Sequence, residues 1–466
     1  MAAATLTTPA ELTPHYSQTI LQSNFIDFTN SSFEQWGQQH MPDIYEQEVE
    51  RYGNRSLKGF IEAIGAEYPL ESDQVIWTEQ GRLHLSYEDM TCGADTSGAN
   101  VISMKGSATH AIRKGQTIKV TDGTDTVNAY VTEGIETDNT QIKVECYTNS
   151  TGCVAAGIST TADAVSVFVF GSEFNKGTVG MDTSIEPELN TFSVKPIISK
   201  DNYTVNGSDT AQIGWVSIST EGGRDGYAWY LKASSDTKTR FEDYCEMKLL
   251  ESVKATNANL DVDGTEGYFA AVKARGIRAT NMFDSAADVI SDFRLMTKEL
   301  DKQGSIEENM LYLNRDASNM FDQGLADANG HYSGGTSYGV FQNSEDMALN
   351  LGFSGVRMGS YDFYKSDWKY LNDGATRGSG AFTDVKGTLV PAGTVSVYDQ
   401  QLGKNIRRPF LHVRYRASAN GAVNRRLMTT VLGLAAGTSD LDATSIEMLS
   451  EKALVTQAAN NFAIFE

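Results

Sequence analysis

Short apolar runs separated by polar, glycine-containing turns fill the stretch from residue 93 to 176. The clearest runs are 117–121, 128–131, 141–144 and 165–170. Strand-like runs at this spacing are typical of a small β-barrel or β-sandwich. Helical and mixed patterns resume on both sides. The pattern therefore predicts a β-rich insertion, and insertions of this kind lie on outer surfaces.

Helical periodicity appears in four other stretches. The longest predicted helix covers about residues 227–257, well above the average helix length. Its predicted, mostly apolar face consists of Phe241, Tyr244, Cys245, Lys248, Leu249, Ser252 and Val253. A shorter helix is predicted over 284–303 from Val289, Phe293, Met296 and Leu300. Two further helices are predicted near 57–64 and 317–328, and residues 256–267 are read as a loop.

Strands are predicted outside the β-rich stretch as well. Residues 192–198 and 213–218 read as two strands of a long hairpin whose tip is the polar stretch 199–209. Further short strands are predicted at 74–77, 82–85, 309–313, 393–398, 410–415 and 424–434. The last residues, 445–466, mix helix-like and strand-like patterns. Helices and strands in this arrangement indicate an α+β fold.

The first 54 residues have the composition expected of an extended arm. They mix Ser, Thr, Gln and Asn with isolated apolar residues, among them Phe25, Phe28, Phe33 and Trp36. Such a segment cannot bury these side chains by itself. We therefore expect it to contact a partner surface.

The composition adds no further element to this prediction, but it argues against several classes of function and location. Of 466 residues, 40% are hydrophobic and 21% charged, which is ordinary for a globular protein large enough to need no stabilising cofactor. The formal net charge of −22 argues against broad binding to phosphate backbones. Residues 1–22 show no signal-peptide pattern, and the strongest apolar run, 164–170, is too short to span a bilayer. The expected location is the cytoplasm, without a membrane.

The residues that carry chemistry are scattered. Ser337 lies in a G-x-S-x-G match, but the surrounding Gly/Ser loop lacks the strand and helix of a nucleophile elbow. The six histidines stand singly, and residues 261–264 lack the spacing of a calcium loop. The four cysteines read as reduced thiols, although Cys146 and Cys153 could bridge a hairpin. We expect no enzyme activity, no metal and no cofactor.

One basic cluster stands out in this acidic chain. It comprises Lys404, Arg407, Arg408, Arg414 and Arg416, together with His412, Arg425 and Arg426. Arginine forms two-point pairs with carboxylates and is enriched at interfaces, so the cluster predicts a contact with an acidic neighbouring copy. A solvated sheet face and contact with packaged nucleic acid remain open as alternatives.

The order of arm, hairpin, long helix, mixed α/β region with glycine-rich loops and returning strands resembles the Hong Kong 97-type fold of the major capsid proteins of tailed double-stranded DNA bacteriophages. Residues 72–83 and 451–461 look similar to capsid proteins of crAss-like phages. The resemblance covers nearly the whole chain except the β-rich insertion, and it rests on element order more than on a strict motif.

The resemblance implies a role for each part of the chain. The implied parts are an N-terminal arm with a first helix (1–70), a peripheral-domain segment (71–92), a β-rich insertion (93–178), an E-loop (179–222), a spine helix (223–258), an axial domain (259–400) and returning peripheral strands (401–466). The implied function is self-assembly into pentamers and hexamers of an icosahedral shell that encloses the phage DNA without sequence-specific binding. The implied location is the virion, assembled in the bacterial cytoplasm.

The implied partners are other copies of the chain, the portal and other capsid proteins, with scaffolding and decoration proteins as further candidates. Two other interpretations stay open: an encapsulin-like bacterial shell protein, which shares the fold, and an unrelated β-rich surface or adhesion protein. An adhesin would be expected to carry a signal peptide, and an encapsulin to have a cargo-loading peptide encoded nearby.

Overall fold

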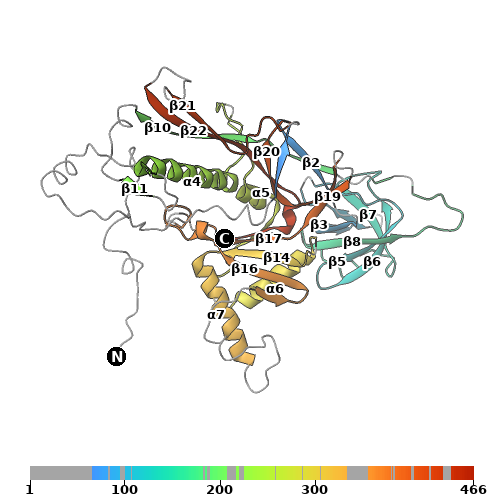
Figure 1. Cartoon of the computed structure of the whole chain (residues 1–466). Coiled ribbons are helices and arrows are strands. Elements are labelled where there is room, and N and C mark those ends of the chain that lie inside the picture. The colour runs from blue at the N-terminus through green and yellow to red at the C-terminus, as the bar shows by residue number, and fades with distance from the viewer. Residues whose placement is uncertain are drawn as a thin grey trace, which may run out of the picture. The chain divides into compact units, whose positions relative to one another are not determined.

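The structure is a computed structural model in which two compact units are seen (Figure 1). It describes residues 66–81, 84–94, 100–106, 108–181, 184–185, 189–206, 217–219, 225–257, 259–285, 287–304, 306–332, 355–378, 380, 382, 384–399, 404–418, 421–433 and 442–466. The first unit comprises the described residues up to Val75 and from Ser193 to Glu466, and the second runs from Ile76 to Phe192. Each unit is described separately below.

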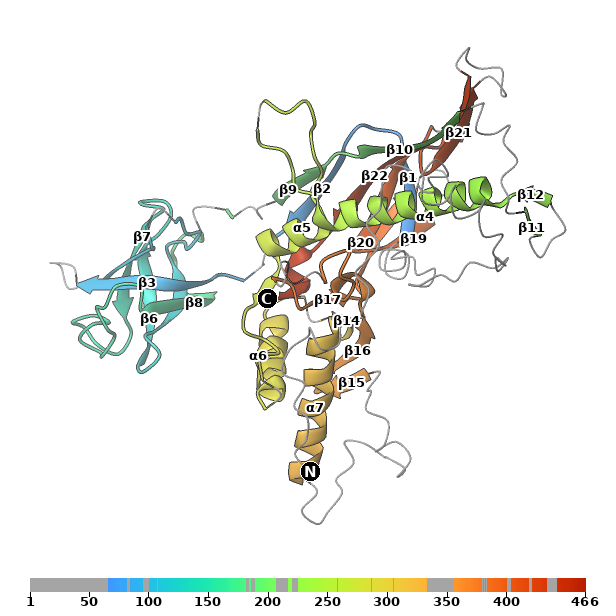
Figure 2. The ribbon, with the colours of Figure 1, turned by 90° about the vertical axis from the view of Figure 1, so that its left-hand side faces the viewer.

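A five-stranded sheet and a long helix form one part of the first unit. The strand order is β1-β20-β22-β10, with β21 also paired to β22. The strands are β1 (Ala66–Leu70), β10 (Ile197–Asn206), β20 (Leu411–Arg416), β21 (Met428–Gly433) and β22 (Ala443–Thr456). Strand β1 runs parallel to β20, and the other pairs are antiparallel. Helix α4 (Ala228–Glu251) lies along one face of this sheet (Figure 2).

A six-stranded mixed sheet forms the other part of the first unit, in the order β13-β23-β17-β14-β16-β15. Its strands are β13 (Ile277–Ala279), β14 (Glu308–Leu313), β15 (Gly355–Met358), β16 (Tyr361–Asp367), β17 (Gly387–Pro391) and β23 (Ala463–Phe465). The helices beside it are α5 (Tyr268–Arg275), α6 (Val289–Asp301) and α7 (Arg315–Tyr332). Two short 3-10 helices, η2 (Lys369–Leu371) and η4 (Ala459–Asn461), precede β17 and β23.

The six-stranded sheet separates two hydrophobic cores, because successive side chains of a strand point to opposite faces. On β23, Ile464 packs in the core with α4 and α5, whereas Ala463 and Phe465 pack in the core with α6 and α7. On β14, Tyr312 and Leu311 divide between the two cores in the same way. The strands of this sheet therefore hold the two layers of helices together.

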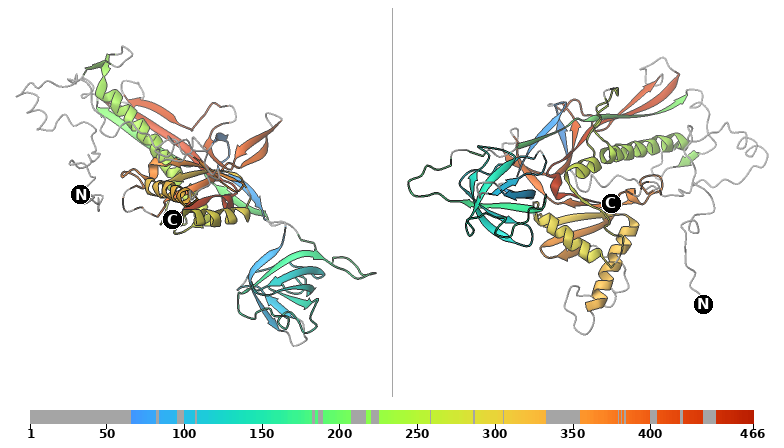
Figure 3. Two further views of the ribbon diagram at one scale, coloured as in Figure 1. Left: turned by 90° about the horizontal axis from the view of Figure 1, so that it is seen from below. Right: turned by 180° about the vertical axis from the view of Figure 1, so that it is seen from behind.

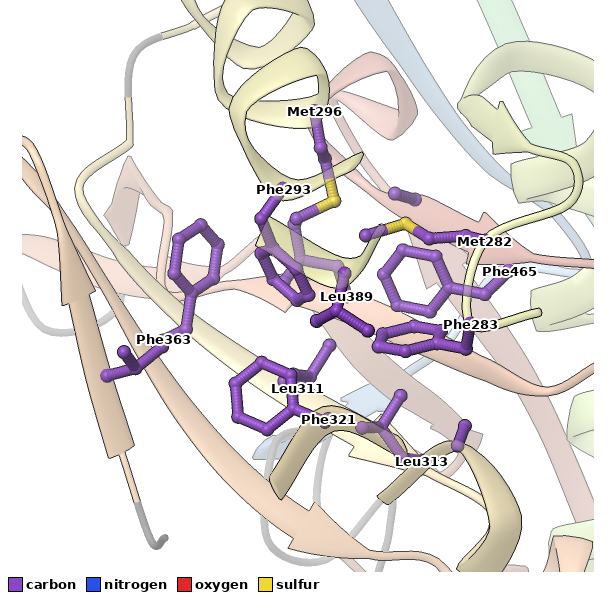
Figure 4. Close-up of a cluster of buried hydrophobic side chains, with 14 of the residues drawn as sticks. Met282, Phe283, Phe293, Met296, Leu311, Leu313, Phe321, Phe363, Leu389 and Phe465 are labelled. Carbon is purple, nitrogen blue, oxygen red and sulfur yellow. The ribbon is translucent and has the colours of Figure 1, made fainter. Parts of the chain in front are cut away.

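The core beneath α6 and α7 is rich in aromatic side chains (Figure 4). Phe293 of α6 lies 5.2 Å from Phe321 of α7 and 5.4 Å from Phe363 of β16, ring centroid to ring centroid. Phe283 makes an edge-to-face contact with Phe465 at 5.3 Å. Edge-to-face pairs of this kind add about 0.5–1.5 kcal/mol each beyond the burial of their area.

The second unit contains a closed barrel, visible in the left view of Figure 3. Its order is β3-β4-β7-β6-β5-β8, and β8 pairs back to β3. The strands are β3 (Ser86–Ala94), β4 (Asn100–Ser103), β5 (Gln116–Thr121), β6 (Thr126–Glu133), β7 (Gln141–Cys146) and β8 (Val165–Ser172). Alternate residues such as Ile118, Val120, Val165 and Val167 fill the interior.

Three two-stranded ladders complete the described strands. They are β2 (Val75–Gln80) with β9 (Leu189–Val194), β11 (Ser217–Ser219) with β12 (Asp225–Tyr227), and β18 (Thr394–Asp399) with β19 (Lys404–Pro409). The β18–β19 ladder places Arg408 directly opposite Val395.

Many of the predicted elements are present. The α+β class, the long helix and the strands of the β-rich stretch are confirmed, and that stretch forms a barrel. Val289, Phe293, Met296 and Leu300 are all buried on α6, as their spacing predicts. The predicted helix at 57–64 and the residues Phe25, Phe28, Phe33 and Trp36 lie outside the described residues.

The predicted polar hairpin tip is wrong over 199–206. Strand β10 continues through these residues to Asn206 and pairs with β22 from Ala443 to Lys452. Ser199 and Asp201 face α4, where Lys248 and Arg240 donate hydrogen bonds to them. The strand tolerates polar residues here because helix α4 supplies partners that are distant in sequence. The second predicted hairpin strand is described only over Ser217–Ser219.

Several smaller predictions also need correction, and one helix was missed. Residues 84–85 lie outside any strand, because the barrel strand begins at Ser86 and not near 93. Helix α4 ends at Glu251, and Tyr244 on its predicted apolar face is half exposed. Helix α5 was not predicted. The segment 443–456 forms one continuous strand, in which long-range pairing overrides the mixed local pattern.

Candidate subunit interface

The basic cluster is shared between β19 and β20, and the alternation of β20 determines which way its residues point. Leu411 and Val413 are buried in the core under α4 and α5. His412, Arg414 and Arg416 alternate with them and therefore lie on the opposite face of the sheet. The sequence pattern of apolar and basic residues thus becomes one apolar and one basic face.

Strand β1 brings an aromatic residue into this basic face. Its parallel register places Tyr68 directly opposite Arg414. The Tyr68 ring makes an edge-to-face contact with the ring of His412 at 5.8 Å. The guanidinium carbon of Arg408, from β19, lies 4.9 Å from the Tyr68 ring centroid. We call Tyr68, Arg408, His412 and Arg414 the basic surface.

His412 is neutral on this surface at pH 7. Its side chain is 3% exposed, and its Nδ1 lies 3.0 Å from the carbonyl oxygen of Pro409. Since a carbonyl oxygen only accepts, Nδ1 carries the proton of the neutral ring. Burial, together with the neighbouring charges of Arg414 and Arg408, lowers the pKa of His412 to about 4.

The basic residues around this surface are paired with carboxylates. Arg416 lies 2.7 Å from Asp73, and Arg425 lies 2.5 Å from Glu451. Glu67 contacts Arg426 and lies 2.9 Å from Lys452. Burial acts to raise the pKa of Glu67, but these two cations hold it below its usual value.

Arg408 and Arg414 differ from these neighbours. Within the described part of the chain neither forms an ion pair, and the Nε atom of each is buried without a hydrogen-bond acceptor. Burial and the like charge of Arg408 lower the pKa of Arg414. Buried donors without acceptors are costly, and native proteins usually satisfy them. The pair is therefore well placed to receive an anionic group.

The structure brings together only some of the predicted site residues. Arg408 and Arg414 are adjacent, Arg416 is engaged with Asp73, and Arg407 is exposed on β19. For Lys404 only the backbone, in β19, is described. The contribution of Tyr68 was missed, because no local pattern relates residues 66–70 to residues 411–416.

The other chemical candidates give no site. Ser337 lies outside the described residues, and among the described ones no group of three His, Cys, Asp or Glu side chains could hold a metal ion. Asp263 forms an exposed ion pair with Lys195 at 3.0 Å. Cys146 and Cys153 carry free thiols, and burial raises the pKa of Cys153 to about 12. No helix in the described ranges is long and apolar enough to cross a membrane.

Comparisons with known proteins find no matching family model and no matching curated protein. Several solved structures are similar to the chain. One, in the asymmetric unit of the mature capsid of bacteriophage PhiM1, is 10% identical over 91% of each chain, with a TM-score of 0.40. Another, from Gordonia phage Cozz, is 10% identical and covers 97% of this chain and 99% of that chain, with a TM-score of 0.41. A third, the capsid of a native GTA particle, is 9% identical over 92% and 95% of the two chains, with a TM-score of 0.36.

Proposed function

We propose that this chain is the major capsid protein of a tailed double-stranded DNA phage, and that it self-assembles into the pentamers and hexamers of an icosahedral shell. The observation that carries the proposal is the order of elements in the first unit. Strand β10 precedes α4, which lies along the five-stranded sheet, and the mixed sheet with α5, α6 and α7 follows. The chain then returns through β20, β22 and β23. This is the order that the sequence resemblance implies.

The C-terminal strands join both sheets of the first unit, which is expected of a rigid shell subunit. Strands β20 and β22 join the five-stranded sheet, and β23 joins the six-stranded sheet. The last strand contributes to both hydrophobic cores, so the end of the chain is bound to two layers of the same unit. A shell subunit needs such rigidity, because small errors in its geometry accumulate around a closed ring.

The sheet also exposes apolar residues at one end of the face opposite α4, where β10 and β21 lie. Helix α4 covers the side of Ser199 and Asp201. On the other side of β10, Ile198 is 50% exposed, and Met428 of β21 is 38% exposed. Exposed apolar residues on a sheet face fit a surface that neighbouring copies cover.

The parts of the chain receive the following proposed roles. They are an N-terminal arm (1–70), peripheral segments (71–92 and 401–466), an outer insertion containing the barrel (93–178), an E-loop (179–222), a spine helix (223–258) and an axial domain (259–400). Lys404, Arg407, Arg408, Arg414, Arg416, Phe25, Phe28, Phe33 and Trp36 are proposed to contact neighbouring copies. The proposed further partners are the portal, scaffolding and decoration proteins.

The negative net charge of the chain is consistent with a shell that encloses DNA. A net charge of −22 per copy gives a wall that does not bind phosphate backbones broadly. A wall that repels DNA leaves the genome free to move during packaging and ejection. The proposal therefore includes no sequence-specific contact with DNA.

Size-exclusion chromatography of the purified full chain, with negative-stain electron microscopy of every peak, tests the proposal. We expect rings, tubes or closed shells with five-fold and six-fold capsomers. A chain that stays monomeric at high concentration, with crowding agent and divalent ions added, would contradict self-assembly. Shells that form only around a co-expressed cargo protein would favour an encapsulin-like container.

A further inference from the structure

Two arginines of the basic surface carry charges that the described structure leaves unbalanced. Arg416, Arg425 and Arg426 each contact a carboxylate, whereas Arg408 and Arg414 contact none among the described residues. Two neighbouring, partly buried cations without an anion repel each other and lose hydration. In a chain with 60 acidic residues, this arrangement calls for a specific partner.

The chemistry of the surface indicates what that partner is. Guanidinium groups bind carboxylates in a planar, two-point geometry. The guanidinium carbon of Arg408 lies 4.9 Å from the Tyr68 ring centroid, so the aromatic ring packs against this side chain. His412, buried against the Tyr68 ring, is neutral and adds no positive charge. The surface is thus suited to one or two carboxylates carried on a peptide.

The first 50 residues are the part of the sequence with the matching charge. They contain no Lys and no Arg. Their carboxylates are Glu11, Asp27, Glu34, Asp43, Glu46, Glu48 and Glu50. The last four fall within eight residues, and Glu46, Glu48 and Glu50 alternate, so an extended segment would present all three on one side.

We propose that Arg408 and Arg414 form a docking site for the acidic segment 43–50 of a neighbouring copy, held by guanidinium–carboxylate pairs. This inference rests on the proposed function, because it assigns the contact to two copies of an assembling chain. It names the partner of the site and the residues on both sides. It also accounts for the absence of a carboxylate beside these two partly buried arginines in the described structure.

Charge-swap variants of the full chain test the pairing. Arg408→Glu with Arg414→Glu should lower the yield of assembled particles at least tenfold, measured by sedimentation and electron microscopy. Adding Glu46→Arg, Glu48→Arg and Glu50→Arg should restore it. The matched control adds Glu11→Arg, Asp27→Arg and Glu34→Arg, which reverse the same number of charges and should not restore assembly.

A variant with a neutral side chain at position 414 shows whether assembly is lost through misfolding or through loss of docking. Arg414→Met removes a desolvated charge that has no partner within the subunit, so the dissociated subunit should be as resistant to urea as the wild type, or more so. Its assembly should still be weakened. A variant that loses both stability and assembly would overturn the proposal, because the arginine would then be needed within its own fold.

Cross-linking identifies which copy supplies the segment. A photo-reactive benzoylphenylalanine replaces Glu48, and particles are assembled from equal amounts of unlabelled and ¹⁵N-labelled chains. We expect cross-links to peptides that contain Tyr68, Arg408 or Arg414, with mixed isotopic pairs. Cross-links only within one chain, or to other peptides, would overturn the proposal.

The remaining outcomes separate the two proposals. Wild-type chains that never assemble would contradict the proposed function itself. Wild-type chains that assemble, with a charge-swap variant that assembles equally well, would overturn only the docking site. If the charge-swap variant of Arg408 and Arg414 assembles normally but no longer binds double-stranded DNA fragments, the two arginines would be assigned to packaged DNA instead.

Discussion

Arg377 forms a two-point ion pair with Glu251, the last residue of α4. Its Nη2 lies 2.7 Å from Oε2 of Glu251, and its Nε contacts Oε1. The same guanidinium contacts Asp384 and lies 4.8 Å from the ring centroid of Phe269. The Tyr370 hydroxyl donates a 2.5 Å hydrogen bond to Glu251. The end of the long helix is thereby fixed to the loop that follows η2.

Replacing Arg377 by lysine should destabilise the first unit. Lysine keeps the positive charge but loses the two-point geometry and the stacking on Phe269. Because the Arg377 side chain is 13% exposed, we expect the free energy of unfolding to fall by about 1–3 kcal/mol. Urea unfolding followed by circular dichroism measures this change.

Arg315→Lys is the matched control. Arg315 lies 2.5 Å from Asp367, but its side chain is 62% exposed. Exposed pairs contribute at most about 1 kcal/mol, so this variant should unfold almost like the wild type. If both variants lose the same free energy of unfolding, the two-point geometry at Glu251 contributes no extra stability.

The buried His412 should make the protein less stable in mild acid. The unfolded chain takes up this proton near the ordinary pKa of 6.5, and the folded chain only near 4. Between these values the unfolded state binds more protons, so the free energy of unfolding falls as the pH drops from 6.5 to 4. The loss from this residue is about 3 kcal/mol at most.

His412→Asn tests this assignment, because asparagine can still donate to the Pro409 carbonyl but does not titrate. Urea unfolding at several pH values should show a shallower pH dependence than in the wild type. His84→Asn, at an exposed position, should keep the wild-type slope. If the slope of the His412 variant equals that of the wild type, another group controls the acid response.

How well the sequence predicts each element depends on how its burial is distributed. Helix α6 shows the clear case, because Val289, Phe293, Met296 and Leu300 are buried on one face and exposed residues fill the other. Helix α5 shows the opposite case. Tyr268, Phe269, Ala271 and Val272 are buried at helical spacing, but the helix has only eight residues, so its period spans barely two turns and does not stand out in the sequence.

Pairing over long sequence separations limits prediction in the same way. The polar residues of β10 read as a hairpin tip, because their partners Arg240 and Lys248 belong to the following helix. At the basic surface the arginines themselves were predicted from their clustering. Their state of pairing was not, since it depends on Tyr68 and Asp73, more than 300 residues away.

The aromatic core of the first unit gives a test within one helix. Phe293 is fully buried against Phe321 and Phe363, whereas Leu295 of the same helix is 63% exposed. Phe293→Ala should lower the free energy of unfolding by about 3–5 kcal/mol through lost burial and a cavity. Leu295→Ala should lower it by less than about 0.5 kcal/mol. Similar losses in both variants would contradict the packing of α6 seen in Figure 4.

The barrel is held at one end by a buried amide. Asn100 of β4 is 2% exposed. Its Oδ1 accepts hydrogen bonds from the backbone N–H groups of Cys153 and Val154, and its Nδ2 donates to the carbonyl of Gly93 at 3.2 Å. This side chain therefore connects β3 and β4 to the segment that precedes β8.

Asn100→Ala should destabilise the barrel selectively, because it leaves these backbone groups buried without partners, at about 1–3 kcal/mol for each unsatisfied group. Hydrogen–deuterium exchange of the full chain should show faster exchange in peptides from residues 86–172 and unchanged exchange in α6. Asn128→Ala, at an exposed position of β6, should exchange like the wild type. Faster exchange spread equally over both units would mean that the barrel and the first unit unfold as one cooperative body.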